Sequence, residues 1–272
     1  MKEKIIVSLT TWEKRMSNIP EVLDSILSQT VPPDLVVLNI SNALLLPVEV
    51  EEYLVQHNVE VNRVKDTKVF KKLIPTLKRY PQDCVISIDD DWIYPREMIQ
   101  EFVSLHKQFP NNPISGKKEL CGGIPVHCGC ASLTKASFYS NIDLVDEEVM
   151  ANCKSDDIVY SYFAAQSGHP YIWTVNNYYT NMIAYNSNDS YTTQDYSEKN
   201  SDIKTLEYLV NRFGNLKNIY ECFNIDPCLS PIMSHETISS SLSLNFIIVG
   251  IVFKLYLLTI SKSSGITNMF SS

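Results

Sequence analysis

The chain has 272 residues, of which 44% are hydrophobic and 20% charged, so it can bury a substantial core in one domain or in one domain with an appendage. Its formal charge of −8 argues against a nucleic-acid-binding protein, because phosphate contacts require clustered lysine and arginine side chains. The seven cysteines are an odd number, and the opening MKEKIIVSLTTW lacks a signal-peptide pattern, so a reducing cytoplasm is the expected location.

The first part of the chain alternates strand-like and helix-like segments. Residues 5–9 form an apolar run, as expected of a strand that is covered on both faces. A helix follows, with Asn18 as its expected N-cap and Pro20 in its first turn, and it ends before Pro32. Strands are also predicted at 35–40, 59–64 and 84–88, with helices at 47–56 and 71–80. This alternation predicts an α/β fold with a mainly parallel sheet flanked by helices.

The fourth predicted strand runs directly into an acidic triplet in CVISIDDDWIYP, formed by Asp89, Asp90 and Asp91. Ligands of such sheets bind beyond the carboxyl ends of the strands. Three adjacent carboxylates are costly unless a cation neutralises them, and Mg²⁺ or Mn²⁺ takes oxygen ligands from carboxylates and substrate phosphates. The alternative is a solvated turn that caps a helix beginning near Pro95. The apolar strand before the triplet and the aromatic Trp92 and Tyr94 after it favour the metal site.

A second acidic pair stands in SDDIVYSYFAAQSG, where Ser155 is the expected N-cap of a helix and Gly168 its stop. Asp156 and Asp157 would then lie in the first turn. The helix dipole favours their ionised form there, so either carboxylate can act as a base. The alternative is the ordinary preference for acidic residues in a first turn.

Basic residues gather in KDTKVFKKLIPTLKRYP, where Lys71 and Lys72 open the helix predicted at 71–80. A cation at this place suits the diphosphate of a nucleotide. A solvated basic face explains the same spacing equally well.

Between the two acidic motifs, the sequence contains Cys121, Cys128 and Cys130 in a C-x6-C-x-C spacing. This spacing is poor for zinc, so small buried thiols are the favoured interpretation. His127 can contact a sugar or phosphate, although a lone histidine is more often a buried structural residue. The following ASLT predicts a strand.

Together, the segments IIVSLTTWEKRM, KDTKVFKKLIPTLKRYPQDCVISIDDDWIYP and KSDDIVYSYFA resemble bacterial glycosyltransferases of the family 2 type, which have a GT-A (Rossmann-like) fold. The resemblance is to the branch related to capsule and lipopolysaccharide sugar transferases. It is ordered along the chain and covers residues 1–214, ending in NSDIKTLEYLVNRFG, which is similar to the closing helix of that branch. The acidic triplet alone is moderately specific, and its combination with the S-L-T-T…R opening and the K-K-L-I-P helix is more so.

The resemblance implies a role for each matching residue. Asp91 and Asp89 would bind Mn²⁺ or Mg²⁺, with the nucleotide ribose as the alternative contact of Asp89, and Asp90 completes this DXD position. The other residues implied in nucleotide binding are Thr10, Thr11, Arg15, Asp66 and Lys72. Asp156 and Asp157 occupy the place of the catalytic base, with Asp157 favoured. The family often has Glu-Asp there, so which carboxylate acts is left open.

The implied activity is an inverting, metal-dependent transfer of a sugar from a nucleotide-diphosphate donor, with UDP favoured. The acceptor would be a hydroxyl of a glycan or a lipid-linked molecule in surface polysaccharide synthesis. One alternative is a nucleotidyltransferase that makes nucleotide sugars, which is disfavoured because SLTTWEKRM lacks the glycines of a phosphate loop. Another is a non-catalytic sugar- or metal-binding module, which the intact acidic motifs disfavour.

Beyond residue 214 we expect a linker at 215–241 and an apolar tail at 242–272. Residues 242–260 carry one charge, Lys254. Since a bilayer span needs ~20 apolar residues, this run predicts a membrane-associated helix that would hold the protein at the inner face of the cell membrane. The alternatives are an apolar helix folded back on the domain and an irregular extension.

Overall fold

The computed structural model describes residues 3–127, 130–174, 183–184, 201–214 and 216. These residues fall within one compact unit, Met1–Ile219. The predicted tail at 242–272 and all but one residue of the predicted linker lie outside the described residues, so both stay predictions. No helix in the described ranges is long and apolar enough to cross a membrane.

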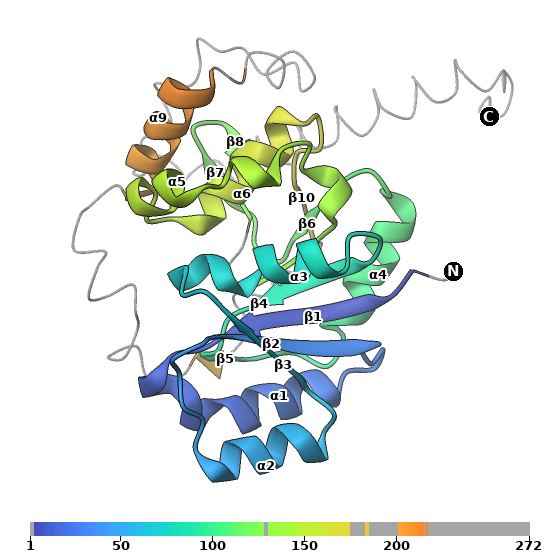
Figure 1. Cartoon of the computed structure of the whole chain (residues 1–272). Coiled ribbons are helices and arrows are strands. Elements are labelled where there is room, and N and C mark those ends of the chain that lie inside the picture. The colour runs from blue at the N-terminus through green and yellow to red at the C-terminus, as the bar shows by residue number, and fades with distance from the viewer. Residues whose placement is uncertain (1–2, 128–129, 175–182, 185–200, 215, 217–272) are drawn as a thin grey trace, which may run out of the picture. The chain divides into compact units, whose positions relative to one another are not determined.

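A seven-stranded sheet organises the molecule (Figure 1). Its strands are β1 Ile5–Thr10, β2 Leu35–Ser41, β3 Glu60–Val64, β4 Cys84–Ile88, β6 Ile114–Ser115, β9 Ala131–Thr134 and β10 Ile172–Trp173. The strand order is β10-β6-β9-β4-β1-β2-β3, and β9 runs antiparallel to both of its neighbours while the other pairs are parallel. The predicted α/β class with a mixed, mainly parallel sheet is therefore confirmed.

Two short ribbons and a set of helices complete the described structure. The ribbons pair β5 Trp92–Ile93 with β11 Ile183–Ala184, and β7 Leu120–Cys121 with β8 Ile124–Pro125. The α-helices are α1 Ile19–Leu27, α2 Val48–Gln56, α3 Ile74–Arg79, α4 Met98–Gln108, α5 Glu147–Asn152, α6 Asp156–Gln166 and α9 Ser201–Phe213. The 3₁₀ helices are η1 Glu13–Asn18, η2 Lys68–Lys72, η3 Ala136–Phe138 and η4 Ile142–Leu144.

The first predicted helix begins after Asn18, as expected, but without the predicted side-chain cap, and the helix predicted at 71–80 is not continuous. Asn18 has helical dihedral angles (φ −80°, ψ −21°) and makes no side-chain cap, because η1 leads directly into α1 and the Ile19 N–H already bonds to the Met16 carbonyl. The helix predicted at 71–80 is divided into η2 and α3. Pro75 stands in the first turn of α3 and has no N–H to bond back to Lys71, so one continuous helix is not available there.

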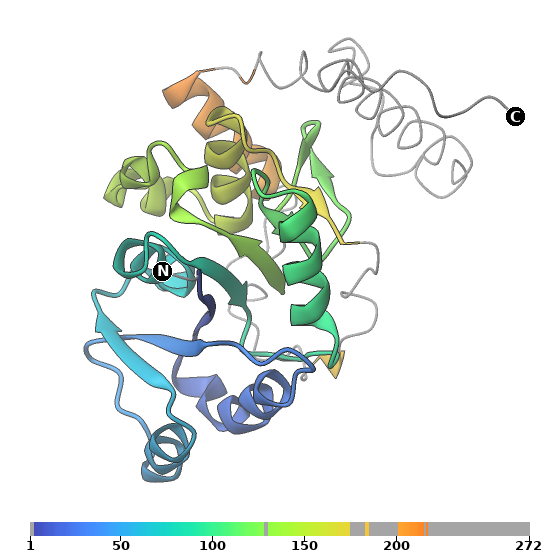
Figure 2. The ribbon, with the colours of Figure 1, turned by 90° about the vertical axis from the view of Figure 1, so that its right-hand side faces the viewer.

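The two faces of the sheet differ in polarity. Alternate residues such as Val7, Leu38 and Ile86 form the apolar core with α1 and α4, which Figure 2 shows on one side of the sheet with α3 on the other. On the α3 side, Ser8 Oγ donates to the Lys72 carbonyl at 2.6 Å and lies 2.7 Å from the Thr76 hydroxyl. These buried bonds fix η2 against β1.

Candidate active site

The acidic triplet lies beyond the carboxyl end of β4, next to the end of the parallel strand β1. Arg15, which follows β1, binds both Asp90 and Asp91: its Nη1 lies 2.6 Å from Asp90 Oδ1 and its Nη2 lies 3.1 Å from Asp91 Oδ2. The Thr11 hydroxyl donates to Asp90 Oδ2 at 2.6 Å. Both oxygens of the buried Asp90 are thus engaged in holding the two turns together.

Lys72 connects the two acidic motifs. Its Nζ lies 3.0 Å from Asp89 Oδ1, 3.2 Å from Asp156 Oδ2 and 3.9 Å from Asp157 Oδ1. Its side chain is 6% exposed, so these carboxylates surround a cation that has little access to water. The structure therefore places carboxylates that are 67 and more residues apart in the sequence around one ammonium group.

The second acidic pair occupies the first turn of α6, as predicted. Ser155 is the N-cap, and its side chain accepts a hydrogen bond from the Ile158 N–H. The two carboxylates differ in access to solvent, because the Asp156 side chain is 9% exposed and that of Asp157 is 31% exposed. Asp157 is therefore more accessible to a molecule from solvent than Asp156.

Tyr94 stands beside the triplet in the sequence, but its contacts with the backbone were not predicted. Its ring is buried, and its hydroxyl lies 2.9 Å from both the N–H and the carbonyl of Asp89 and 2.7 Å from the Cys130 carbonyl. The side chain thus braces the backbone at the first residue of the triplet. An aromatic residue with a polar tip, five positions after the strand-end aspartate, is the one signal that pointed toward it.

Two other predicted contacts lie beside this arrangement rather than in it. The Thr10 hydroxyl donates to the Asn39 carbonyl at 2.7 Å. Asp66 forms an ion pair with Lys71 and accepts the Lys68 N–H at 3.1 Å, and its side chain is 64% exposed. None of these contacts of Thr10 and Asp66 involves the carboxylates around Lys72. Their roles in nucleotide binding stay predictions.

The cluster carries excess negative charge. Five carboxylates, those of Asp89, Asp90, Asp91, Asp156 and Asp157, face two cationic side chains, so three negative charges are left over when all are ionised. Burial and the charge of Asp89 raise the pKa of Asp91 to about 7, although Arg15 opposes the shift. Burial also raises the pKa of Asp156 against the effect of Lys72. Burial alone would lower the pKa of Lys72, but the surrounding carboxylates hold it well above its ordinary value.

The residues present fit a divalent cation of the Mg²⁺ or Mn²⁺ type. Asp89 and Asp91 keep 30% and 24% of their side chains exposed, whereas Asp90 is buried. In the described part of the chain these aspartates do not converge into a cage of three ligands within 4.8 Å. Mg²⁺ usually binds one or two carboxylates and completes its shell with water and phosphate oxygens, so an open pair of carboxylates suffices.

His127 is buried, and its ring nitrogens and backbone N–H all have hydrogen-bond partners in the protein. Its Nε2 lies 3.0 Å from Ser87 Oγ, its Nδ1 lies 2.7 Å from the Tyr171 hydroxyl, and its N–H donates to Ser161 Oγ at 2.6 Å. The interpretation as a buried structural histidine is confirmed. Tyr160, whose ring centroid lies 5.1 Å from that of His127, is fully buried, and its hydroxyl has no hydrogen-bond partner among the described residues.

The cysteines between the acidic motifs show no convergence in the described ranges. Cys130 is buried and Cys121 is half-buried, while Cys128 lies outside the described residues. The zinc interpretation of this spacing, disfavoured from the sequence, gains no support from the positions that are described.

No protein-family model matches this sequence, and no curated protein matches it. Among solved structures, the chain is similar to S. aureus TarS 1-349 in complex with UDP, with 14% identity and a TM-score of 0.49 over 84% of this chain and 77% of that one. It is also similar to glucosyl-3-phosphoglycerate synthase from Mycobacterium tuberculosis in complex with Mn²⁺, UDP-glucose and phosphoglyceric acid, with 18% identity and a TM-score of 0.34 over 42% and 43%. A third is 4-diphosphocytidyl-2C-methyl-D-erythritol synthase, with 13% identity and a TM-score of 0.42 over 65% and 92%. At these TM-scores the likenesses assign no residue and no activity to this chain.

Proposed function

We propose that this protein is an inverting, metal-dependent glycosyltransferase that moves a sugar from a nucleotide-diphosphate donor to a hydroxyl of a glycan or lipid-linked acceptor in surface polysaccharide synthesis. The observation that carries the proposal is the position of Lys72 between Asp89 and the Asp156–Asp157 pair. The carboxylates of both acidic motifs thus lie together at the edge of the sheet where ligands of such folds bind, and this supports the proposed roles of metal ligand and base.

The residues divide into donor-binding and acceptor-activating groups. Asp91 and Asp89 would hold Mn²⁺ or Mg²⁺, which when bound offsets the charge that develops on a leaving diphosphate. Thr10, Thr11 and Arg15 would contact the nucleotide, with UDP the favoured donor. Asp66 would contact the base. The ammonium of Lys72 would lie near the diphosphate, and the carboxylates around it keep it protonated because they raise its pKa.

Asp157 is the preferred base. Its carboxylate removes a proton from the acceptor hydroxyl, and the oxygen attacks the anomeric carbon from the face opposite the diphosphate. The bond from that carbon to the diphosphate oxygen breaks, so the configuration inverts. Asp156 is less suited to the task because it is buried against Lys72, which leaves it as a group that positions the lysine.

The test is nucleotide release from a panel of UDP- and GDP-sugars with Mn²⁺, with and without a chelator. We expect metal-dependent release from at least one donor and loss of release in Asp91→Ala. The matched control is Asp143→Asn, which changes an 85% exposed aspartate paired with Lys78 and should leave release unchanged. No release from any donor, or a fully active Asp91→Ala variant, would overturn the proposal.

The alternative activities give different products in the same assay. A nucleotidyltransferase would release pyrophosphate from a nucleoside triphosphate and a sugar phosphate, and a binding module would retain Mn²⁺ without turning over any donor. The turn after β1 speaks against the first, because its Thr11 and Arg15 are bound to Asp90 rather than arranged as a glycine-rich phosphate loop.

A further inference from the structure

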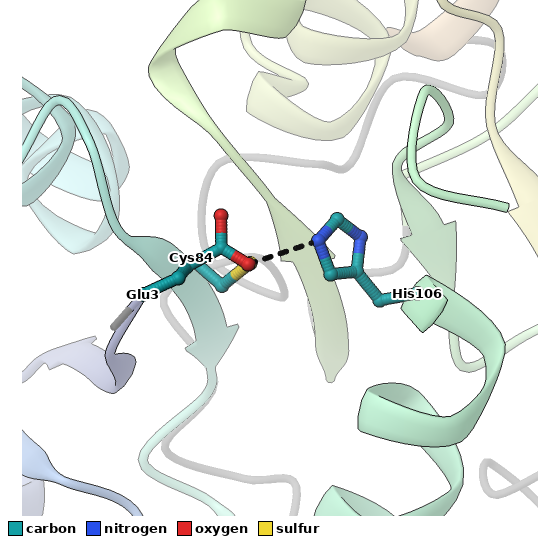
Figure 3. Close-up of side chains that lie close together, drawn as sticks. All are labelled: Glu3, Cys84 and His106. Atoms are coloured by element: carbon teal, nitrogen blue, oxygen red, sulfur yellow. Dashed lines mark hydrogen bonds and ion pairs between the residues drawn. The ribbon is translucent and has the colours of Figure 1, made fainter. Parts of the chain in front are cut away.

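A cluster of three side chains of the types that bind metals lies at the other end of β4. It consists of Glu3, Cys84 and His106 (Figure 3). One ligand atom from each residue lies within 4.8 Å of the others, and the described ranges contain no other such group of three or more. Cys84 begins β4 and Asp89 follows its end, so about 16 Å of strand separates this cluster from the candidate active site.

The register of the sheet explains why the three residues meet. Cys84 stands opposite Ile5 in the parallel β1–β4 ladder, and its N–H donates to the Lys4 carbonyl at 2.9 Å. Side chains alternate along a strand, so Glu3 points to the same face as Ile5 and Cys84, which is the apolar face covered by α4. His106 comes from the last turn of α4. Backbone register and helix packing hold the cluster together.

The side chains are oriented toward one another and are largely buried. His106 Nε2 lies 3.2 Å from Glu3 Oε2, and the Cys84 thiol makes a hydrogen bond with the same carboxylate. Cys84 is fully buried and His106 is 8% exposed, whereas 34% of the Glu3 side chain is exposed. A small ion would therefore enter from the Glu3 side.

Lys135 supplies the outer contact that a ligating carboxylate commonly has. It follows directly after β9 and forms an ion pair with Glu3 Oε1, while Oε2 faces His106. Ligands of metal sites are usually held by such second hydrogen bonds, which fix the orientation of the ligand. Before binding, the Glu3 carboxylate balances the charge of Lys135; once a dication is bound by the Glu3 carboxylate and the Cys84 thiolate, these charges together with Lys135 leave a net charge of +1.

We propose that Glu3, Cys84 and His106 form a metal site of the zinc type, separate from the oxygen-lined site at Asp89 and Asp91. Sulfur, imidazole nitrogen and carboxylate oxygen together form a ligand set of Zn²⁺, whereas Mg²⁺ and Mn²⁺ favour oxygen alone. Three protein ligands leave one tetrahedral position for water. On binding, the Cys84 thiol releases its proton to solvent, the His106 ring carries its proton on Nδ1 instead of Nε2, and the hydrogen bonds to Glu3 are replaced by bonds to the metal. The bound ion would tie the segment before β1, the start of β4 and the end of α4 together.

The test uses the full chain and Co²⁺ as a spectroscopic substitute for Zn²⁺. We expect a thiolate-to-cobalt charge-transfer band that saturates at one equivalent and is displaced by Zn²⁺. Cys84→Ser should lose the band, and His106→Gln should weaken Zn²⁺ binding by at least about 100-fold, since even an outer contact is worth about 10–100-fold. The matched control is Cys153→Ser, which removes another buried cysteine outside the cluster and should keep the band.

Two further variants test the proposal even if Cys84→Ser does not fold. Glu3→Gln alters a partly exposed side chain and should weaken Zn²⁺ binding without changing the circular dichroism spectrum. Asp91→Asn should leave Zn²⁺ binding unchanged, which separates this site from the proposed active site. Equal Zn²⁺ affinity in Glu3→Gln and the wild type, or a cobalt band that survives in folded Cys84→Ser, would show that the cluster is only a hydrogen-bonded group around Glu3.

Discussion

The candidate active site and the hydrogen-bonded network around His127 lie on the same face of the sheet, but the first is charged and the second is neutral. In the network, both ring nitrogens of His127 are matched by the hydroxyls of Ser87 and Tyr171, and no charged side chain is needed. Around Lys72, carboxylates outnumber cations. A polar cluster that the protein satisfies by itself supports the fold, whereas one with unbalanced charge is suited to an ion or a substrate.

The largest expected effect comes from removing the accessible carboxylate of the charged cluster. If Asp157 is the base, Asp157→Asn should lower kcat by about 10²–10⁴-fold, the range that general bases provide, while donor binding in Mn²⁺ stays unchanged. Nucleotide release and donor titration, measured on the same preparation, check this. Activity within a few-fold of the wild type would remove Asp157 from the mechanism.

Asp156→Asn sharpens that result because it changes the neighbouring carboxylate of the same turn. Asp156 is buried against Lys72, so its loss should disturb the lysine and weaken donor binding as well as turnover. Equal behaviour of the two variants would mean that their different exposure has no bearing on catalysis.

The next effect is on stability. Lys72→Met removes a buried cation from among three carboxylates, and breaking a buried ion pair by removing one partner costs about 3–5 kcal/mol. Urea unfolding at pH 8 should show this loss. Lys78→Met is the matched control, because the Lys78 ion pair with Asp143 is exposed and is worth at most about 1 kcal/mol. A loss below about 1 kcal/mol for Lys72→Met would mean that the carboxylates relax or take up protons without the lysine.

The sequence predicted the charged cluster better than the neutral one. Strand-end position and residue type identified Asp89–Asp91, and helix-start signals identified Ser155 and the two aspartates after it. These signals are local. The alternation of strands and helices likewise predicted the sheet, because the periodicity of apolar residues and the turn residues can be recognised within short stretches of chain.

What the sequence did not reveal depends on contacts between distant segments. Nothing near Lys72 in the chain indicates that it lies between Asp89 and Asp156, since this follows from packing η2 on β1 through Ser8. The brace from Tyr94 to the Asp89 backbone was missed for the same reason. Asn18 was misjudged because a 3₁₀ turn before the helix took the place of a side-chain cap.

The neutral network should respond to acid. Burial, assisted by the charge of Lys72, holds the pKa of His127 well below its ordinary value of 6.5, so the folded protein keeps the imidazole neutral. The unfolded chain binds a proton below that value, and the wild type therefore loses about 1.4 kcal/mol per pH unit as pH falls from 6.5 toward the folded pKa. His127→Gln lacks this contribution, so its stability deficit at pH 8 should narrow as the pH falls below 6.5.

Urea unfolding across that pH range checks the acid response, and Tyr171→Phe serves as the control. It removes a hydroxyl partner but keeps the buried imidazole, so it should retain the acid slope of the wild type. Parallel curves for the wild type and His127→Gln would mean that the histidine is protonated equally in the folded and unfolded states.

The smallest expected effect is a difference in stability between variants of two neighbouring tyrosines, Tyr171 and Tyr160. Tyr171 uses its hydroxyl with His127 at 2.7 Å and with Tyr139 at 2.6 Å, whereas the buried hydroxyl of Tyr160 has no partner among the described residues. Tyr171→Phe should therefore lower the free energy of unfolding by about 1–3 kcal/mol. Tyr160→Phe should change it by less than about 1 kcal/mol. The expected change is a stabilisation, because the variant removes an unsatisfied hydroxyl from the core. Paired urea titrations measure both. A loss above 1 kcal/mol in Tyr160→Phe would mean that a water or a bound ligand satisfies this hydroxyl, which would extend the unbalanced region from Lys72 into the network beneath it.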